Sequence, residues 1–225
     1  MKIPALIFWH HLGLGDHFIC NALVHELLQV ADTIWLPCKN LNLTTVCELY
    51  SDHPRVRVFG VHTTDFDDEI RLLCQTSIRY AIPLLKIGSF TGDFAAEFYK
   101  QLDIPIERRW TGFKMPRDRD RANLLYKELI KDTKYALIHR TASVGTFEIS
   151  VKTELPIYTV TKLSESLLDW STIIENAAEI HCIDSSFIHL VDSLDVTKVK
   201  LYYYDVGRGS VLRLSNGWQV IQENQ

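Results

Sequence analysis

The sequence predicts an α/β protein made of two halves, each with its own parallel β-sheet. Short apolar runs such as residues 3–9 (IPALIFW) are typical of strands that are buried on both faces. Segments with helical spacing of apolar residues follow these runs, and the alternation starts again after a basic, proline-containing stretch at 103–120. The 225 residues are enough for two halves of about a hundred residues each.

Composition and charge exclude several classes of protein. The chain is 47% hydrophobic and 23% charged, as globular proteins are, and its 24 basic against 28 acidic residues give a net charge of −4. That balance argues against a general nucleic-acid-binding protein, which needs a basic surface. The five cysteines form no C-x-x-C pair and indicate reduced thiols. With no secretory signal and no apolar run of about 18 residues, we expect a cytoplasmic protein without a transmembrane segment.

The N-terminal half is expected to contain a βαβαβ unit with right-handed crossovers. Its strands are predicted at 3–9, 33–36, 56–61 and 82–87, the second being followed by Pro37. Its helices are predicted at 17–30, 41–50, 65–74 and 93–102. We place the boundary between the halves at 115/116, so that the domains are 1–115 and 116–225.

The C-terminal half repeats the alternation. Its strands are predicted at 135–139, 156–160, 179–183 and 199–204, the last of these ending the sheet. Its helices are predicted at 119–130, 168–178 and 187–194. Basic residues from Arg108 to Arg121 lie around the boundary; we interpret them as a solvated connection in preference to an anion-steering site, and they leave room for peripheral contact with a membrane.

The first candidate site lies between the first strand and the first helix. Gly13 and Gly15 allow a tight turn, and Asp16 lies where a helix begins. The simpler alternative is a loop whose aspartate caps the helix. The dinucleotide fingerprint is incomplete, because Phe18 stands where its third glycine would be. Three histidines adjoin this turn, and for want of a suitably spaced acid or cysteine we expect them to line a polar cleft and bind no metal. They are His10, His11 and His17.

The second candidate site follows the strand at 179–183. Asp184, Ser185 and Ser186 open a helix, where free backbone N–H groups favour a phosphate, and His189 lies about one turn further on. The simpler alternative is a capping motif with a packed histidine.

Two segments carry a resemblance to a known family. Residues 12–27 (LGLGDHFICNALVHEL) are similar to the first-loop signature of the heptosyltransferase-like glycosyltransferases of family 9, which ends in G-D before a helix. Residues 177–194 (AAEIHCIDSSFIHLVDSL) resemble the donor-binding signature of the same family. The resemblance implies two Rossmann-like halves that face each other in a compact GT-B-like fold.

The resemblance also implies roles for single residues. Asp16 matches the candidate general base on the acceptor side, where Gly13, Gly15 and the three histidines also lie. The donor-loop positions match Asp184, Ser185, Ser186 and His189, although the family usually has Thr-Gly where this chain has Ser185-Ser186. The family's lysine-bearing phosphate loop corresponds to a segment with Arg140 and Thr141 and, further on, Lys152. Arg140 can bind a diphosphate with two hydrogen bonds; a surface arginine at a strand end is the alternative.

The function implied is transfer of a sugar from a nucleotide-diphosphate sugar to a hydroxyl of a glycan or another acceptor, without a metal or other cofactor. Asp16 would accept the proton of the acceptor hydroxyl. Because the chain is shorter than usual members of the family, acceptor-side insertions are expected to be missing. Two other functions stay open: a nucleotide-sugar epimerase on the same fold, and a non-catalytic relic that binds a nucleotide or sugar.

Overall fold

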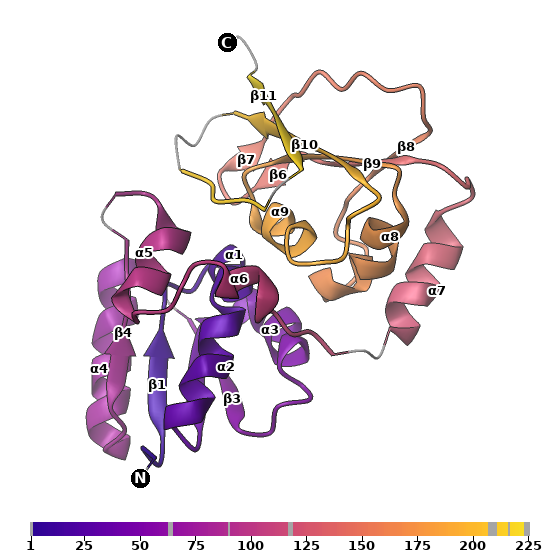
Figure 1. Cartoon of the computed structure of the whole chain (residues 1–225). Helices are drawn as coiled ribbons and strands as arrows, with labels where there is room; N and C mark the ends of the chain where they lie inside the picture. Colours follow the sequence, from indigo (N-terminus) through magenta and orange to yellow (C-terminus); the bar gives the residue numbers. More distant parts are fainter. Residues whose placement is uncertain are drawn as a thin grey trace. The chain divides into compact units, whose positions relative to one another are not determined.

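The computed structural model divides the chain into two compact units, Met1–Pro116 and Arg117–Gln225. It describes residues 2–62, 65–89, 91–116, 119–206, 211–215 and 217–222. Figure 1 shows that each unit combines a sheet with helices, and each unit is described by itself below. The predicted fold class is confirmed at this level: both units are α/β, and each contains a sheet of parallel strands.

Unit 1 is built on a four-stranded parallel sheet with the order β3-β2-β1-β4. Its strands are β1 (Leu6–Trp9), β2 (Ile34–Lys39), β3 (Val56–Val61) and β4 (Leu84–Lys86). The chain runs from β1 outward to β3 and then crosses back to β4 at the other edge. Right-handed connections therefore place the helix before β4 on the face opposite to the helix after β1.

The helices of unit 1 follow the predicted alternation with shifted boundaries. They are α1 (Leu14–Ile19), α2 (Asn21–Val30), η1 (Asn40–Asn42), α3 (Leu43–Leu49), α4 (Phe66–Tyr80), α5 (Phe94–Gln101) and α6 (Arg108–Thr111). The single helix predicted at 17–30 is wrong, because the chain forms two helices that meet at Cys20. The helix expected at 65–74 extends to Tyr80 and ends at Ala81, which has the left-handed φ of 52°.

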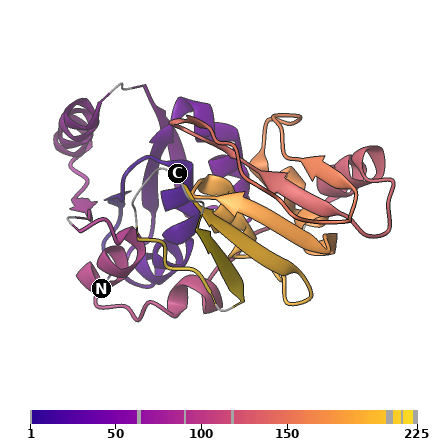
Figure 2. The ribbon, with the colours of Figure 1, turned by 90° about the horizontal axis from the view of Figure 1, so that it is seen from above.

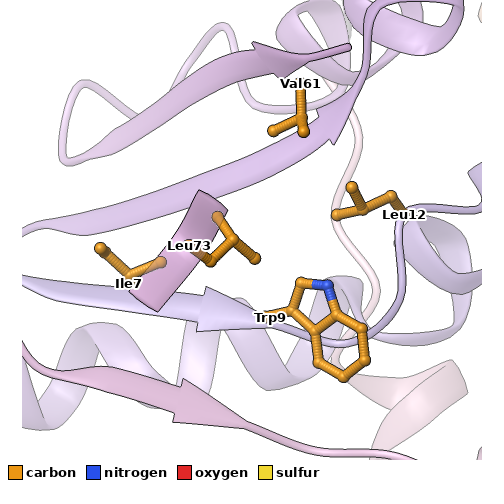
Figure 3. Packing of buried hydrophobic residues seen from close by; sticks show 5 residues of the cluster. All are labelled: Ile7, Trp9, Leu12, Val61 and Leu73. Carbon is orange, nitrogen blue, oxygen red and sulfur yellow. The ribbon is translucent and has the colours of Figure 1, made fainter. Parts of the chain in front are cut away.

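The core of unit 1 explains why β1 is apolar throughout. All four of its side chains are buried, as a central strand with helices on both faces requires. On one face Ile7 and Trp9 pack with Leu73 of α4, and Leu12 and Val61 complete this cluster (Figure 3).

The strand predicted to stop before Pro37 continues to Lys39, and Pro37 pairs in register with Phe59 of β3. The other neighbour, β1, pairs with β2 only at Ile34 and Trp35. Pro37 therefore lies where β2 has a strand on one side only, and a residue without an N–H is tolerated there.

Unit 2 has a five-stranded parallel sheet with the order β11-β10-β9-β5-β8. The strands are β5 (Ala136–His139), β8 (Ile157–Thr159), β9 (Glu179–Ile183), β10 (Lys200–Asp205) and β11 (Trp218–Gln222). In Figure 2 the orange to yellow strands of this unit lie side by side in one twisted sheet. The expectation that the strand at 199–204 ends the sheet is wrong, because β11 adds an edge strand beyond it.

Helices and a small hairpin complete the described part of unit 2. The helical elements are α7 (Asp120–Leu129), η2 (Leu167–Trp170) with α8 (Ser171–Asn176), and α9 (Ser186–Val191). Directly after β5 the chain forms an antiparallel hairpin of β6 (Thr141–Ala142) and β7 (Gly145–Thr146). From this hairpin the chain reaches β8 through residues 147–156, which contain no helix.

The basic stretch around the boundary is only partly a solvated surface: Arg108, Lys114 and Arg121 are exposed, but Arg109 is not. Arg109 is fully buried and lies over the ring of Trp110, and Arg108 forms an ion pair with Glu26 of α2. In unit 2, Arg119 pairs with Glu175, and Arg121 contacts Asp169 at 2.8 Å. Most of these arginines therefore bind segments of their own unit, while Arg117 lies outside the described residues.

Candidate functional site

Each sheet has one topological switch point, and each predicted site loop begins there. In unit 1 the strand order reverses between β1 and β4, and in unit 2 it reverses between β5 and β9. Open parallel sheets bind ligands in the crevice outside the carboxyl ends of the strands at such a point. The loop after β1 and the loop after β9 both start at these carboxyl ends.

In unit 1 the loop after β1 makes a sharp turn before α1. His11 has a left-handed φ of 69°, and Gly13 occupies the N-cap of α1. The side-chain amide of Asn42 donates to the carbonyl of Leu12 at 3.3 Å, which ties the loop to η1. This hydrogen bond therefore holds the loop against η1.

Asp16 lies in the first turn of α1, and its carboxylate bends back over Gly13. A Cβ placed on Gly13 would lie only 2.6 Å from Asp16 Oδ2, closer than atoms of this kind approach. The glycine thus provides the space in which the carboxylate lies. Asp16 is partly exposed, so a proton acceptor there can be reached from solvent.

The three histidines of this loop do not share one environment. His10 and His17 are buried, with ring centroids 4.6 Å apart, and their ring nitrogens have no hydrogen-bond partner in the described part of the chain. Burial lowers the pKa of His10 to about 3 and holds the pKa of His17 well below its usual value. These two neutral rings pack beneath the loop, which corrects the expectation that they line a polar cleft.

His11 is half-buried and packs against α5, with ring centroids 5.5 Å from Phe94 and 5.8 Å from Phe98. His11 belongs to the loop after β1, and α5 follows β4. This contact therefore connects the segments that follow the two strands on either side of the switch point of unit 1. Burial and the nearby charge of Lys86 lower the pKa of His11, so the ring is neutral at pH 7.

In unit 2 the chain leaves β9 through Asp184 and Ser185, which are both buried. Ser185 is the N-cap of α9 by its backbone position, yet its side chain makes no capping hydrogen bond. The hydroxyl instead lies 3.1 Å from Nδ1 of His139, the last residue of β5. The capping alternative therefore does not account for this serine.

His139 is a candidate site residue that sequence reasoning missed. Its ring stacks on Phe187 at 4.7 Å with an interplanar angle of 20°, and burial lowers its pKa to about 4. The signal in the sequence was its place at the end of an apolar strand, directly before Arg140. Its contact with Ser185 depends on the pairing of β5 with β9, which no local pattern reveals.

The other donor-loop candidates do not all lie at the carboxyl edge of this sheet. Arg140 is partly exposed and binds Glu148 at 2.8 Å, while the hydroxyls of Thr141 and Thr146 are 3.2 Å apart across the hairpin. Lys152 is exposed in the irregular segment before β8. Its neighbour Thr153 forms a hydrogen bond with Glu179, the first residue of β9, so the structure does not bring Lys152 together with the donor loop after β9. Ser186 is partly exposed, and His189 is buried within α9.

Within the described ranges, no group of three or more His, Cys, Asp and Glu side chains could hold a metal ion. In the same part of the chain, no helix is both long and apolar enough to cross a membrane.

The fold is similar to solved glycosyltransferases. A family 9 glycosyl transferase from Veillonella parvula superposes with a TM-score of 0.61 and 9% identity over 100% of this chain and 89% of its own. ADP-heptose LPS heptosyltransferase II of E. coli superposes with a TM-score of 0.56 and 11% identity, over 97% of this chain and 90% of its own. The iron-containing dodecameric glycosyltransferase TibC from enterotoxigenic E. coli superposes with a TM-score of 0.54 and 11% identity, over 91% of this chain and 59% of its own. No protein-family model and no curated protein sequence matches the chain.

The predicted resemblance to family 9 is therefore confirmed at the level of the fold, since the chain superposes on these glycosyltransferases over 97–100% of its length. The roles of single residues, the domain assignment to acceptor and donor, and the way in which the halves face each other stay predictions.

Proposed function

We propose that this chain is a glycosyltransferase that moves a sugar from a nucleotide-diphosphate sugar to an acceptor hydroxyl. The observation that carries the proposal is the placement of both candidate loops at the switch points of their sheets, in a chain whose fold matches family 9 glycosyltransferases over its whole length. The acceptor would bind at unit 1, beside Asp16, and the donor at unit 2.

In this reaction Asp16 accepts the proton of the acceptor hydroxyl as its oxygen attacks the anomeric carbon. The bond between the anomeric carbon and the diphosphate breaks, and the diphosphate leaves with both bonding electrons. Arg140 and the hydroxyl groups of the loop after β9 would stabilise the negative charge that collects on the diphosphate. Arg140 is suited to this because a guanidinium binds two phosphate oxygens at once.

The glutamate partner of Arg140 is compatible with this role. The Arg140–Glu148 pair is exposed, and such pairs contribute about 0–1 kcal/mol, so a diphosphate can replace the carboxylate at little cost. The cysteines support a cytoplasmic location, because all five are unpaired, as thiols are in a reducing compartment.

A transfer and hydrolysis assay with a panel of UDP-, GDP- and ADP-sugars tests the proposal. Asp16→Asn keeps the shape of the side chain but removes the base, and we expect turnover to fall by about two to four orders of magnitude. Asp32→Asn, which changes an exposed carboxylate of the same unit, is the control and should keep full activity. Equal turnover of Asp16→Asn and the wild type would exclude Asp16 as the base.

Product analysis by NMR separates the proposal from its rivals. A transferase consumes donor and acceptor together, whereas an epimerase returns an isomerised donor with the acceptor untouched. Diphosphate binding without turnover for any donor would identify a binding protein.

A further inference from the structure

We propose that His139 positions the hydroxyl of Ser185 for binding a diphosphate, so that these two side chains act as one hydrogen-bonding pair in unit 2. The inference rests on the proposed function, because it concerns the site where the donor would bind. It adds a positioning residue that the resemblance to family 9 did not assign.

The sheet brings the two residues together from distant parts of the sequence. β5 and β9 are paired so that His139 lies opposite Cys182, and the chain reaches Ser185 three residues later. The distance between Ser185 Oγ and His139 Nδ1 is 3.1 Å, which is a hydrogen bond. The pair lies at the carboxyl edge of the two strands that flank the switch point, where a ligand of such a sheet is expected.

Packing holds both partners in place. The ring of His139 stacks on Phe187 at 4.7 Å, which fixes its plane and keeps Nδ1 toward Ser185. Ser185 is only 4% exposed, and its hydroxyl makes no capping bond to α9. The hydroxyl is therefore oriented by the imidazole and not by the helix.

The protons on His139 and Ser185 determine which hydrogen-bond donors the pair has for a ligand. At pH 7 the imidazole is neutral, since burial lowers its pKa to about 4, so the ring carries one N–H group. The pair then has two donor groups, the N–H and the serine O–H, and the bond between them uses one. With the ring proton on Nδ1, the imidazole donates to Ser185 Oγ, and the serine O–H remains to donate to a ligand. An anionic oxygen forms the strongest bond with this hydroxyl.

Calorimetric titration of the full chain with inorganic pyrophosphate, UDP, GDP and ADP tests this role. Ser185→Ala should weaken binding about tenfold, the effect of losing one hydrogen bond to a charged group. His139→Phe keeps an aromatic ring for the stack on Phe187 but removes the hydrogen bond, and it should weaken binding to a similar extent. The double variant should bind no more weakly than the weaker of the two single variants, because the pair acts as a unit.

His181→Phe is the matched control. This histidine of unit 2 also bonds a hydroxyl, that of Tyr204 at 3.0 Å, and also stacks on an aromatic ring, that of Tyr202 at 4.6 Å. It lies within β9 and away from the carboxyl edge. Its replacement should leave pyrophosphate affinity unchanged.

A second pair of variants tests rescue. Asn places an amide nitrogen near the position of Nδ1, whereas Gln places it near Nε2, so His139→Asn should bind within about threefold of the wild type and His139→Gln about tenfold more weakly. These variants also serve if His139→Phe does not fold, which circular dichroism would show.

Additive losses in the double variant, or wild-type affinity in His139→Phe or His139→Gln, would overturn the inference and leave the donor site intact. If the wild-type chain binds neither pyrophosphate nor any nucleoside diphosphate, the proposed function fails, and the role of His139 fails with it.

Discussion

Gly13 and Asp16 depend on each other through one close approach. Because a Cβ at Gly13 would lie 2.6 Å from Asp16 Oδ2, Gly13→Ala must move the carboxylate while leaving the backbone of the loop in place. We expect this variant to fold normally and to lose most of its transferase turnover, since a base displaced by about 1 Å can cost two orders of magnitude. Steady-state kinetics and thermal unfolding measure the two effects separately.

Gly88→Ala is the control for this prediction. Gly88 follows β4 at the same edge of unit 1, and a Cβ there would meet only His11 Nε2 at an ordinary 3.8 Å. Turnover should be unchanged. If Gly13→Ala were as active as Gly88→Ala, the position of the Asp16 carboxylate would be irrelevant to turnover.

For single residues, the sequence predicted the positions of those that lie directly after a strand. It did not predict contacts that depend on how the strands pair. Asp16 and Ser185 follow apolar runs, so their place at a carboxyl edge could be predicted. The burial of His10 and His17 and the contact between His139 and Ser185 depend on side chains that are distant in the sequence or on how a helix packs.

Among the elements, β11 shows how tertiary contacts override a weak local pattern. Its five residues, WQVIQ, do not alternate regularly between apolar and polar side chains. The strand is held because Asp192, just after α9, accepts hydrogen bonds from Trp218 Nε1 at 3.0 Å and from the backbone and hydroxyl of Ser215 at 2.8 and 2.6 Å. A buried carboxylate thus anchors an edge that periodicity alone does not predict.

Asp192→Ala should therefore release β11. The change leaves the three donors without their acceptor, and we expect a loss of about 2–3 kcal/mol in the free energy of unfolding. Hydrogen exchange should show the loss first at 217–222. Asp195→Ala, which removes an exposed carboxylate bonded only locally to Thr197, should change stability by less than about 0.5 kcal/mol. Equal protection of β11 in both variants would contradict this account.

In the molecule as a whole, neutral buried histidines make stability depend on pH. Burial lowers the pKa of His10 to about 3 and the pKa values of His25 and His139 to about 4, whereas a histidine in an unfolded chain has a pKa near 6.5. Below pH 6.5 the unfolded chain binds protons that the folded chain does not. Stability present above pH 6.5 is therefore lost as the pH falls toward 4, by about 1.4 kcal/mol per pH unit for a group as buried as His10.

The stability of the two units should depend on pH to different extents. The histidines with lowered pKa values in unit 1 are His10, His11, His17 and His25, of which His10 and His17 are fully buried; those in unit 2 include His139 and His181. Hydrogen exchange followed by mass spectrometry between pH 7.5 and 4.5 should show a steeper loss of protection in unit 1. A steeper loss in unit 2, or none in either unit, would contradict the prediction.

The fold as a whole was largely predictable, because alternating buried strands and amphipathic helices leave few topologies. The strand orders could not be predicted from the sequence. They matter most for the candidate site, since they put the loops after β1 and β9 at switch points.

The central claim is that a nucleotide-sugar donor binds at the carboxyl edge of β5 and β9, and a crystal of the protein soaked with UDP-, GDP- and ADP-sugars tests it most directly. The account predicts diphosphate density beside Ser185 and His139, within reach of Arg140. Density for the diphosphate at any other place in the chain would contradict it.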